Sequence, residues 1–90
     1  MTPHQLLTYD YVEDILERRA PHRERHLAHV AAYKGDGRLV LAGAIGDPPR
    51  GALFVFSGDD PEVAEEFAAA DPYVEARLVS DRRIERLNVV

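Results

Sequence analysis

Three histidines lie close together in the segment PHRERHLAHV, namely His22, His26 and His29. On an α-helix, which turns by about 100° per residue, all three fall within an arc of about 60°. Imidazole gains and loses a proton near neutral pH, so a half-buried histidine can act as a general acid or base. We expect this role for His26, which lies at the edge of the apolar stripe through Leu27 and Val30, whereas His29 lies furthest toward solvent.

Two other interpretations of these histidines stay open. Histidines on a helix surface are often no more than solvated side chains. Histidines one turn apart can also bind zinc, but the HExxH pattern is absent, and Arg23 and Arg25 lie between His22 and His26. Two guanidinium groups would repel a dication, so we expect no metal here.

The candidate partner of His26 is Asp71, which is followed by Pro72 and Tyr73. An aspartate before proline is also a common end to a helix, because the residue before proline disfavours helical backbone. If the two main helices pack side by side, the end of one helix can approach the other. A carboxylate there would hold one tautomer of His26 and stabilise its protonated form.

Two arginines and three tyrosines supply candidate groups for binding a substrate. Arg19 and Arg23 are four residues apart on one helical side, so they could hold an anionic group by charge-assisted hydrogen bonds. Ion pairs with nearby carboxylates or with a neighbouring subunit are the structural alternative. Tyr73, together with Tyr9 and Tyr11, could wall a pocket, although buried tyrosines are also common in protein cores.

The composition excludes several classes of protein. The chain has 90 residues, with 11 Lys+Arg against 16 Asp+Glu, and a formal net charge of −5 at pH 7. This acidic balance argues against nucleic-acid binding, which needs a basic face. There is no apolar run of about 18 residues, so we expect no membrane span. The absence of cysteine excludes disulfides, thiol nucleophiles and thiolate metal sites.

The same survey indicates a single small domain, residues 1–90, without a cofactor. The glycines are scattered and form neither a phosphate-binding loop nor a dinucleotide fingerprint. The first residues have neither the basic nor the apolar region of an export signal, so we expect a cytoplasmic protein.

The hydrophobic pattern predicts a β-α-β-β-α-β order of elements. Strands are expected over 5–11, 38–45, 52–57 and 82–90, and helices over 12–20, 21–34 and 61–70. Pro21 should either kink one long helix or lie in the first turn of a second one. This order is that of the ferredoxin-like α+β fold, in which a four-stranded antiparallel sheet carries both helices on one face. The second and third strands are apolar on both faces, so we expect a homodimer that packs through the open sheet face.

Three segments make the chain resemble the YciI-like (YCII-related) family over nearly its full length. These are RAPHRERHLA from Arg19, LAG from Leu41 and DPYVEA from Asp71. The resemblance implies a dimeric ferredoxin-like α/β barrel and an active site that pairs His26 with Asp71. The family pattern often continues DPYVEA with glycine, where this chain has Arg77, which we expect near the mouth of the pocket.

The leading hypothesis is a small cofactor-free enzyme of the lyase or isomerase type, acting on an anionic or enolisable small molecule. His26 would transfer the proton, Asp71 would orient His26, and Arg19 or Arg23 would hold the anionic group, with Tyr73 beside them. The alternative is a non-catalytic dimeric module that binds a ligand in the same pocket or serves in assembly. An open cavity at His26 would favour the enzyme, whereas a tightly packed imidazole would favour the module.

Overall fold

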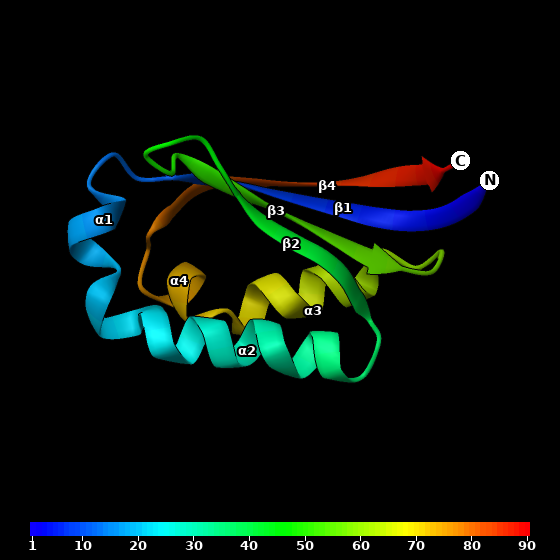
Figure 1. Ribbon diagram of the computed structural model, residues 1–90, viewed down its shortest axis with the longest axis horizontal. Coiled ribbons are helices and arrows are strands. Elements are labelled where there is room, and N and C mark those ends of the chain that lie inside the picture. Colours follow the sequence, from blue (N-terminus) through cyan, green and yellow to red (C-terminus); the bar gives the residue numbers. More distant parts are fainter.

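The structure, a computed structural model, describes residues 1–90 and has two layers, a sheet and a set of helices on one of its faces (Figure 1). The antiparallel sheet has the order β2-β3-β1-β4. The strands are β1 (Thr2–Tyr11), β2 (Leu39–Ile45), β3 (Gly51–Ser57) and β4 (Val79–Val89), and the helices are α1 (Ile15–Arg18), α2 (Arg23–Gly35), α3 (Glu62–Ala70) and α4 (Pro72–Glu75). The predicted ferredoxin-like α+β class is therefore confirmed. With 13 residues in its longest helix, the structure has none that is long and apolar enough to cross a membrane.

The core lies between the two central strands and the helices. Side chains alternate across a strand, so Leu7 and Tyr9 of β1 point to the helix layer, as do Phe54 and Phe56 of β3. All four are almost completely buried, and they pack around Phe67 of α3. This alternation gives the chain one aromatic inner face, against which any polar side chain must find a partner.

The segment between β1 and α2 is less helical than the sequence predicts. Only α1 is α-helical in the expected stretch 12–20, and a single 3-10 turn, η1 (Ala20–His22), follows it. Pro21 lies in this turn. The α-helix does not continue through it, because proline has no N–H for the next backbone hydrogen bond. Arg19 and Arg23 are therefore separated by η1 and do not share one helix. This corrects the expectation that they lie on one side of the same helix.

The inner face of α2 also differs from the expected one. His26 and Tyr33 are buried, while His29 and Val30 are partly buried, so the core stripe follows an i, i+3, i+4, i+7 pattern. Leu27, which was expected in this stripe, is 47% exposed. Three of the four inward positions thus carry ring side chains with polar atoms.

The expectation that His29 faces solvent is wrong for a specific reason. Its ring stacks on Phe67, with centroids 4.5 Å apart, and its Nε2 lies 2.9 Å from the carbonyl oxygen of Phe67. An N–H at Nε2 donates to this carbonyl near the end of α3, where helical carbonyls lack backbone donors. The polar atom is satisfied, so the ring can pack inward.

The junction of α3 and α4 places Asp71 beneath the sheet. Asp71 leaves the helical conformation (φ −71°, ψ 123°), as expected for a residue before proline, and Pro72 begins α4. The Asp71 side chain caps α4 by accepting from the backbone N–H of Tyr73 at 3.0 Å. One carboxyl group thereby ends one helix and begins the next.

Arg77, which follows α4, adopts a left-handed backbone conformation with φ of 61°. This conformation costs an L-residue about 1–2 kcal/mol, whereas glycine adopts it freely. We expect Arg77→Gly to raise the free energy of unfolding by about 1 kcal/mol, measured by urea denaturation. The matched variant Arg77→Ala keeps the unfavourable conformation and should give no gain; equal stability of the two variants would contradict this explanation.

Candidate active site

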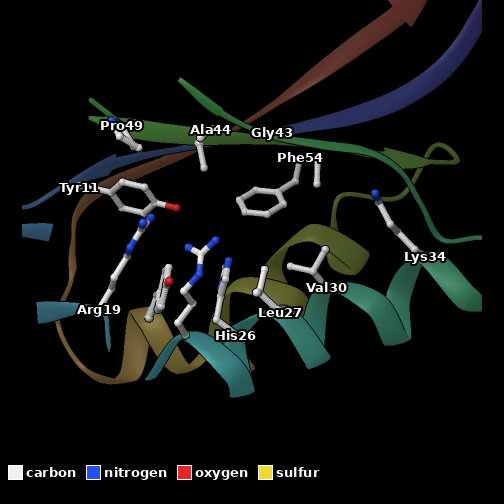
Figure 2. A pocket seen from close by; sticks show the side chains of 14 residues that line it. Tyr11, Arg19, His26, Leu27, Val30, Lys34, Gly43, Ala44, Pro49 and Phe54 are labelled. Atoms are coloured by element: carbon white, nitrogen blue, oxygen red, sulfur yellow. The ribbon is translucent and has the colours of Figure 1, made fainter. Parts of the chain in front are cut away.

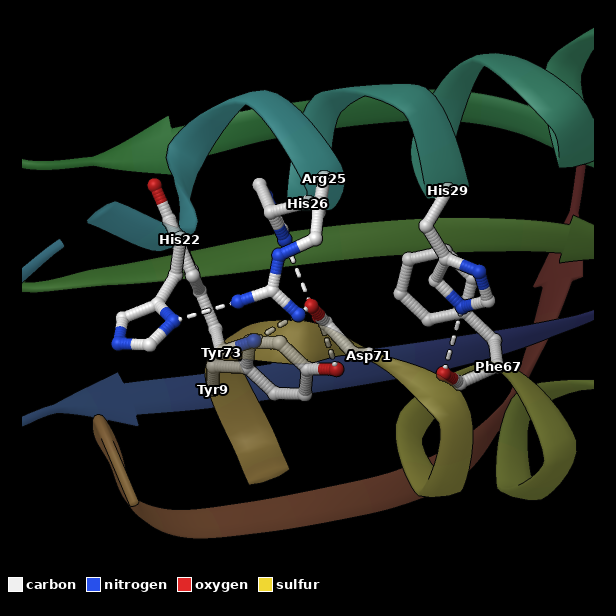
Figure 3. A network of polar contacts seen from close by, with 8 residues as sticks. All are labelled: Tyr9, His22, Arg25, His26, His29, Phe67, Asp71 and Tyr73. Atoms are coloured by element: carbon white, nitrogen blue, oxygen red, sulfur yellow. Dashed lines mark hydrogen bonds and ion pairs between the residues drawn. The ribbon is translucent and has the colours of Figure 1, made fainter. Parts of the chain in front are cut away.

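Three elements bring a chain of polar groups together under the sheet (Figure 3). His26 comes from α2, Asp71 from the α3–α4 junction and Tyr9 from the middle of β1. The Nδ1 of His26 lies 2.8 Å from Oδ1 of Asp71, and the hydroxyl of Tyr9 donates to Oδ2 of Asp71 at 2.8 Å. Tyr9 and Asp71 are 0% exposed and His26 is 6% exposed, so the structure joins the two residues that the sequence proposed as partners.

The hydrogen bonds determine which ring nitrogen of His26 is free. Asp71 accepts from three donors, namely the Tyr73 backbone N–H, the Tyr9 hydroxyl and the His26 ring. A carboxylate is an acceptor only, so the proton of His26 belongs on Nδ1. Its Nε2 is then left with a lone pair that can take up a proton.

Tyr73 fixes the plane of the His26 ring. The two rings are parallel within 2° and their centroids are 3.8 Å apart. The backbone N–H of Tyr73 donates to the same oxygen of Asp71 that His26 contacts, so Asp71 holds both of the stacked residues in place. The Tyr73 hydroxyl is buried without a hydrogen-bond partner.

A cavity of about 300 Å³ lies between α2 and strands β2 and β3, and His26 forms part of its wall (Figure 2). Arg19, Arg23 and Tyr73 line it too, as the sequence analysis expected of a binding site, whereas Asp71 lies behind His26. Arg77 is exposed and does not line the cavity, which corrects the expectation that it sits at the mouth. The space beside His26 is therefore open to a small molecule.

The cavity is electropositive although the chain as a whole is acidic. Arg19, Arg23 and Lys34 line it, and none of its 14 lining residues is an aspartate or glutamate. None of the three cations forms an ion pair within the chain, so the structural alternative of intramolecular pairing does not hold for Arg19 and Arg23. An anionic ligand would find these donors free.

The sequence analysis missed the role of one residue of the site and did not mention another. Tyr9, considered only as a pocket wall, lies behind Asp71, and the inward alternation of Leu7 and Tyr9 on β1 was the signal for its burial. Lys34 lines the cavity from the end of α2, and its spacing of three helical turns from Arg23 could have revealed it.

The other two histidines have separate partners. His22 Nδ1 lies 2.8 Å from an Arg25 guanidinium nitrogen, and His29 contacts the Phe67 carbonyl (Figure 3). No group of three His, Asp or Glu side chains is arranged to hold a metal ion. The spacing of the histidines along the sequence therefore does not bring their ring nitrogens to one point.

Two tyrosines at the site have perturbed acidities. Burial raises the pKa of Tyr9, and the negative charge and hydrogen bond of Asp71 raise this pKa further. Burial also raises the pKa of Tyr11, against the opposing charges of Arg19 and Arg23. Both hydroxyls thus keep their protons in the folded protein at pH values where free tyrosine ionises.

These shifts predict a loss of stability in alkaline solution. Above about pH 10, the ordinary pKa of tyrosine, the unfolded chain releases protons that folded Tyr9 and Tyr11 retain. The stabilisation is fully present below that pH and is lost above it, with a slope of about 1.4 kcal/mol per pH unit for each tyrosine. Urea denaturation at several pH values measures the slope, which should be about halved in Tyr9→Phe. A slope unchanged by this substitution would contradict the assignment.

Comparison with known proteins identifies relatives in sequence and in fold. The model of the YCII-related domain family matches residues 4–88. An uncharacterized protein of Haemophilus influenzae is 33% identical over 79 residues, which cover 78% of this chain and 81% of that protein.

Solved structures share the fold at low sequence identity. One is the 5-chloro-2-hydroxyhydroquinone dehydrochlorinase TftG of Burkholderia phenoliruptrix, in complex with 2,5-dihydroxybenzoquinone, with a TM-score of 0.78, 18% identity, and coverage of 94% of this chain and 93% of TftG. Another is a NIPSNAP family protein of Agrobacterium tumefaciens, with a TM-score of 0.60, 17% identity, and coverage of 100% and 94%. At these identities the likeness concerns the fold alone.

Proposed function

The chain belongs to the family of YCII-related domains, and from this premise we propose that it is a small acid–base enzyme of the lyase or isomerase type. It uses no cofactor, and its substrate is a small anionic or enolisable molecule. The observation that carries the proposal is His26, which is held by Asp71 on one side and lines a cation-rich cavity on the other.

The proposed reaction begins with a proton on a carbon atom next to a carbonyl group, which includes the keto tautomer of a hydroxylated ring. Nε2 of His26 accepts this proton, and the electron pair of the broken C–H bond passes into the substrate. In an isomerisation the imidazolium returns the proton to another atom of the substrate. In an elimination the electron pair forms a C=C bond and expels an anionic leaving group, so that a proton and an anion are lost together.

The surrounding residues have supporting roles in this proposal. Asp71 and Tyr73 keep the imidazole in one orientation, and Asp71 stabilises its protonated form. Arg19 and Arg23 hold the anionic group of the substrate and stabilise the enolate that forms on proton removal. The name of TftG describes an elimination from a hydroxylated ring, which makes such rings reasonable first substrates to test.

The second candidate function is a non-catalytic module that binds the same kind of anion. It is favoured by the tight packing of His26, which is only 6% exposed and has one ring face covered by Tyr73. In this case the His26–Asp71 pair would stabilise the fold, and the ligand would bind and dissociate without a chemical reaction.

Proton transfer to carbon can be tested without knowing the natural substrate. The experiment follows the exchange of carbon-bound protons for deuterium by NMR in D₂O, for hydroxyquinones, phenolic acids and 2-oxo acids, with 2,5-dihydroxybenzoquinone as the first probe. The enzyme hypothesis expects exchange of at least one bound compound that depends on His26. Binding without exchange in the whole set would support the module instead.

We also propose that the protein forms a homodimer through the open face of the sheet. All helices lie on the other face, as Figure 1 shows. The uncovered face carries apolar side chains of β1, β2 and β3, including Leu6, Leu53 and the 56% exposed Leu41. A second copy would remove this surface from water. Light scattering should give twice the mass of 10.1 kDa, and Leu41→Glu should shift the mass toward the monomer.

A further inference from the structure

We infer that the cavity takes a dianion, a ligand with a flat apolar centre and an acidic group at each end. Arg19 and Arg23 bind one of these groups and Lys34 binds the other. The inference rests on the proposed function only in placing the ligand in the same cavity, and it adds Lys34 as a residue that determines specificity.

One stripe of α2 carries the pattern that such a ligand would need. Arg23, Leu27, Val30 and Lys34 follow one another at i, i+4, i+7 and i+11, so they lie within an arc of about 60°. All four line the cavity. The stripe therefore presents a cation at each end and two apolar side chains between them. It also explains why Leu27 is exposed, since its side chain faces the cavity and not the core.

The wall opposite this stripe is apolar and consists mostly of small residues. The alanines of β2 and β3, Ala42, Ala44 and Ala52, form it together with Gly43 and the ring of Phe54. Small side chains leave a gap between sheet and helix, and the almost completely buried Phe54 forms part of its apolar wall. The centre of the ligand should accordingly be thin and apolar.

The two cationic ends are too far apart to serve a single acidic group equally. Arg23 and Lys34 are 11 residues apart, which is about 16 Å along the helix axis. Figure 2 shows Lys34 at the opposite end of the cavity from Arg19, with Leu27 and Val30 between them. No carboxylate of the protein lines the cavity, and none of its three cations is paired. A second acidic group on the ligand would give Lys34 the anionic partner that the protein itself does not supply.

The test compares monoanions with dianions of the same skeleton. Benzoate is paired with terephthalate, and octanoate with the more flexible suberate, in calorimetric titrations at low ionic strength. We expect at least one dianion to bind about three- to tenfold more tightly than its monoanion, because Lys34 is exposed and its charge is partly screened. Lys34→Met should remove this advantage by weakening dianion binding about three- to tenfold, while monoanion binding changes much less. Arg25→Met, which removes a cation of the same helix outside the cavity, should leave the advantage intact.

A second measurement reports directly on the lysine. Lys34 is the only lysine of the chain, so reductive methylation with ¹³C places one label on its side chain and one on the N-terminus, with both charges kept. Titration with the dianion should shift the Lys34 signal, and the N-terminal signal serves as the internal control. The monoanion should leave both signals in place.

The outcomes separate this inference from the proposed function. Equal affinities of monoanion and dianion in both pairs, or an advantage that survives Lys34→Met, would overturn the inference of a dianionic ligand. Neither result would bear on the proposed enzymatic function. Failure of all four compounds to bind would count against the cavity as a binding site, and with it against both proposals. Deuterium exchange that depends on His26, found with monoanions only, would support the enzyme and reject the dianion.

Discussion

Replacement of His26 by glutamine should slow catalysed proton exchange by about 100- to 10,000-fold, the usual contribution of a general acid or base. Glutamine can still donate a hydrogen bond toward Asp71, but its amide neither accepts nor releases a proton near neutral pH. Binding of the substrate should change much less, because Arg19 and Arg23 remain in the cavity. The measurement is the rate of deuterium incorporation, followed by NMR under saturating substrate.

The matched control for this experiment is His29→Gln. His29 lies on the same helix and is also partly buried, but its ring contacts Phe67 and does not line the cavity. The exchange rate should therefore stay within about twofold of wild type, while the free energy of unfolding falls by about 1 kcal/mol through loss of the hydrogen bond. Equal slowing in both variants would indicate a general effect on the fold and would contradict the role of His26.

Replacement of Asp71 by alanine should cost about 3–5 kcal/mol of folding free energy, a large share of what a chain of this size possesses. The substitution removes the acceptor of the His26 ring, the Tyr9 hydroxyl and the Tyr73 backbone N–H at once. Two of these donors belong to buried side chains, which are left without a partner and without access to water. Asp71→Asn keeps the shape and one acceptor, so about 1–3 kcal/mol is expected.

Urea denaturation measures both losses, with Asp81→Ala as the control. Asp81 is an exposed aspartate whose ion pair with Arg83 spans 3.7 Å, and such pairs contribute about 0–1 kcal/mol. A loss below about 1 kcal/mol in Asp71→Ala would show that the buried network is not a stabilising unit. In Asp71→Asn, long-range ¹H–¹⁵N NMR should also show His26 no longer confined to the tautomer with the proton on Nδ1.

The sequence by itself determined the order of the elements and the identity of the principal groups. Turn residues and hydrophobic period located four strands and the long helices, because these signals are local to a few residues. The same local signals placed Asp71 at the end of a helix before Pro72. His26, Arg19 and Arg23 were recognisable because their residue types can transfer a proton or bind an anion wherever they lie. The fold class followed, since few topologies accommodate this order.

Only the tertiary structure decided which faces of α2 serve the core and which serve the cavity. Helical period shows that residues share a face, but not what lies opposite that face. His29 could pack inward because α3 offers it the Phe67 carbonyl, and Leu27 could remain exposed because the alanines of β2 leave a gap beside it. Tyr9 joins Asp71 from a strand 62 positions away in sequence. A buried polar group is stable only with a partner, and that partner comes from another element, so its identity depends on how the elements pack together.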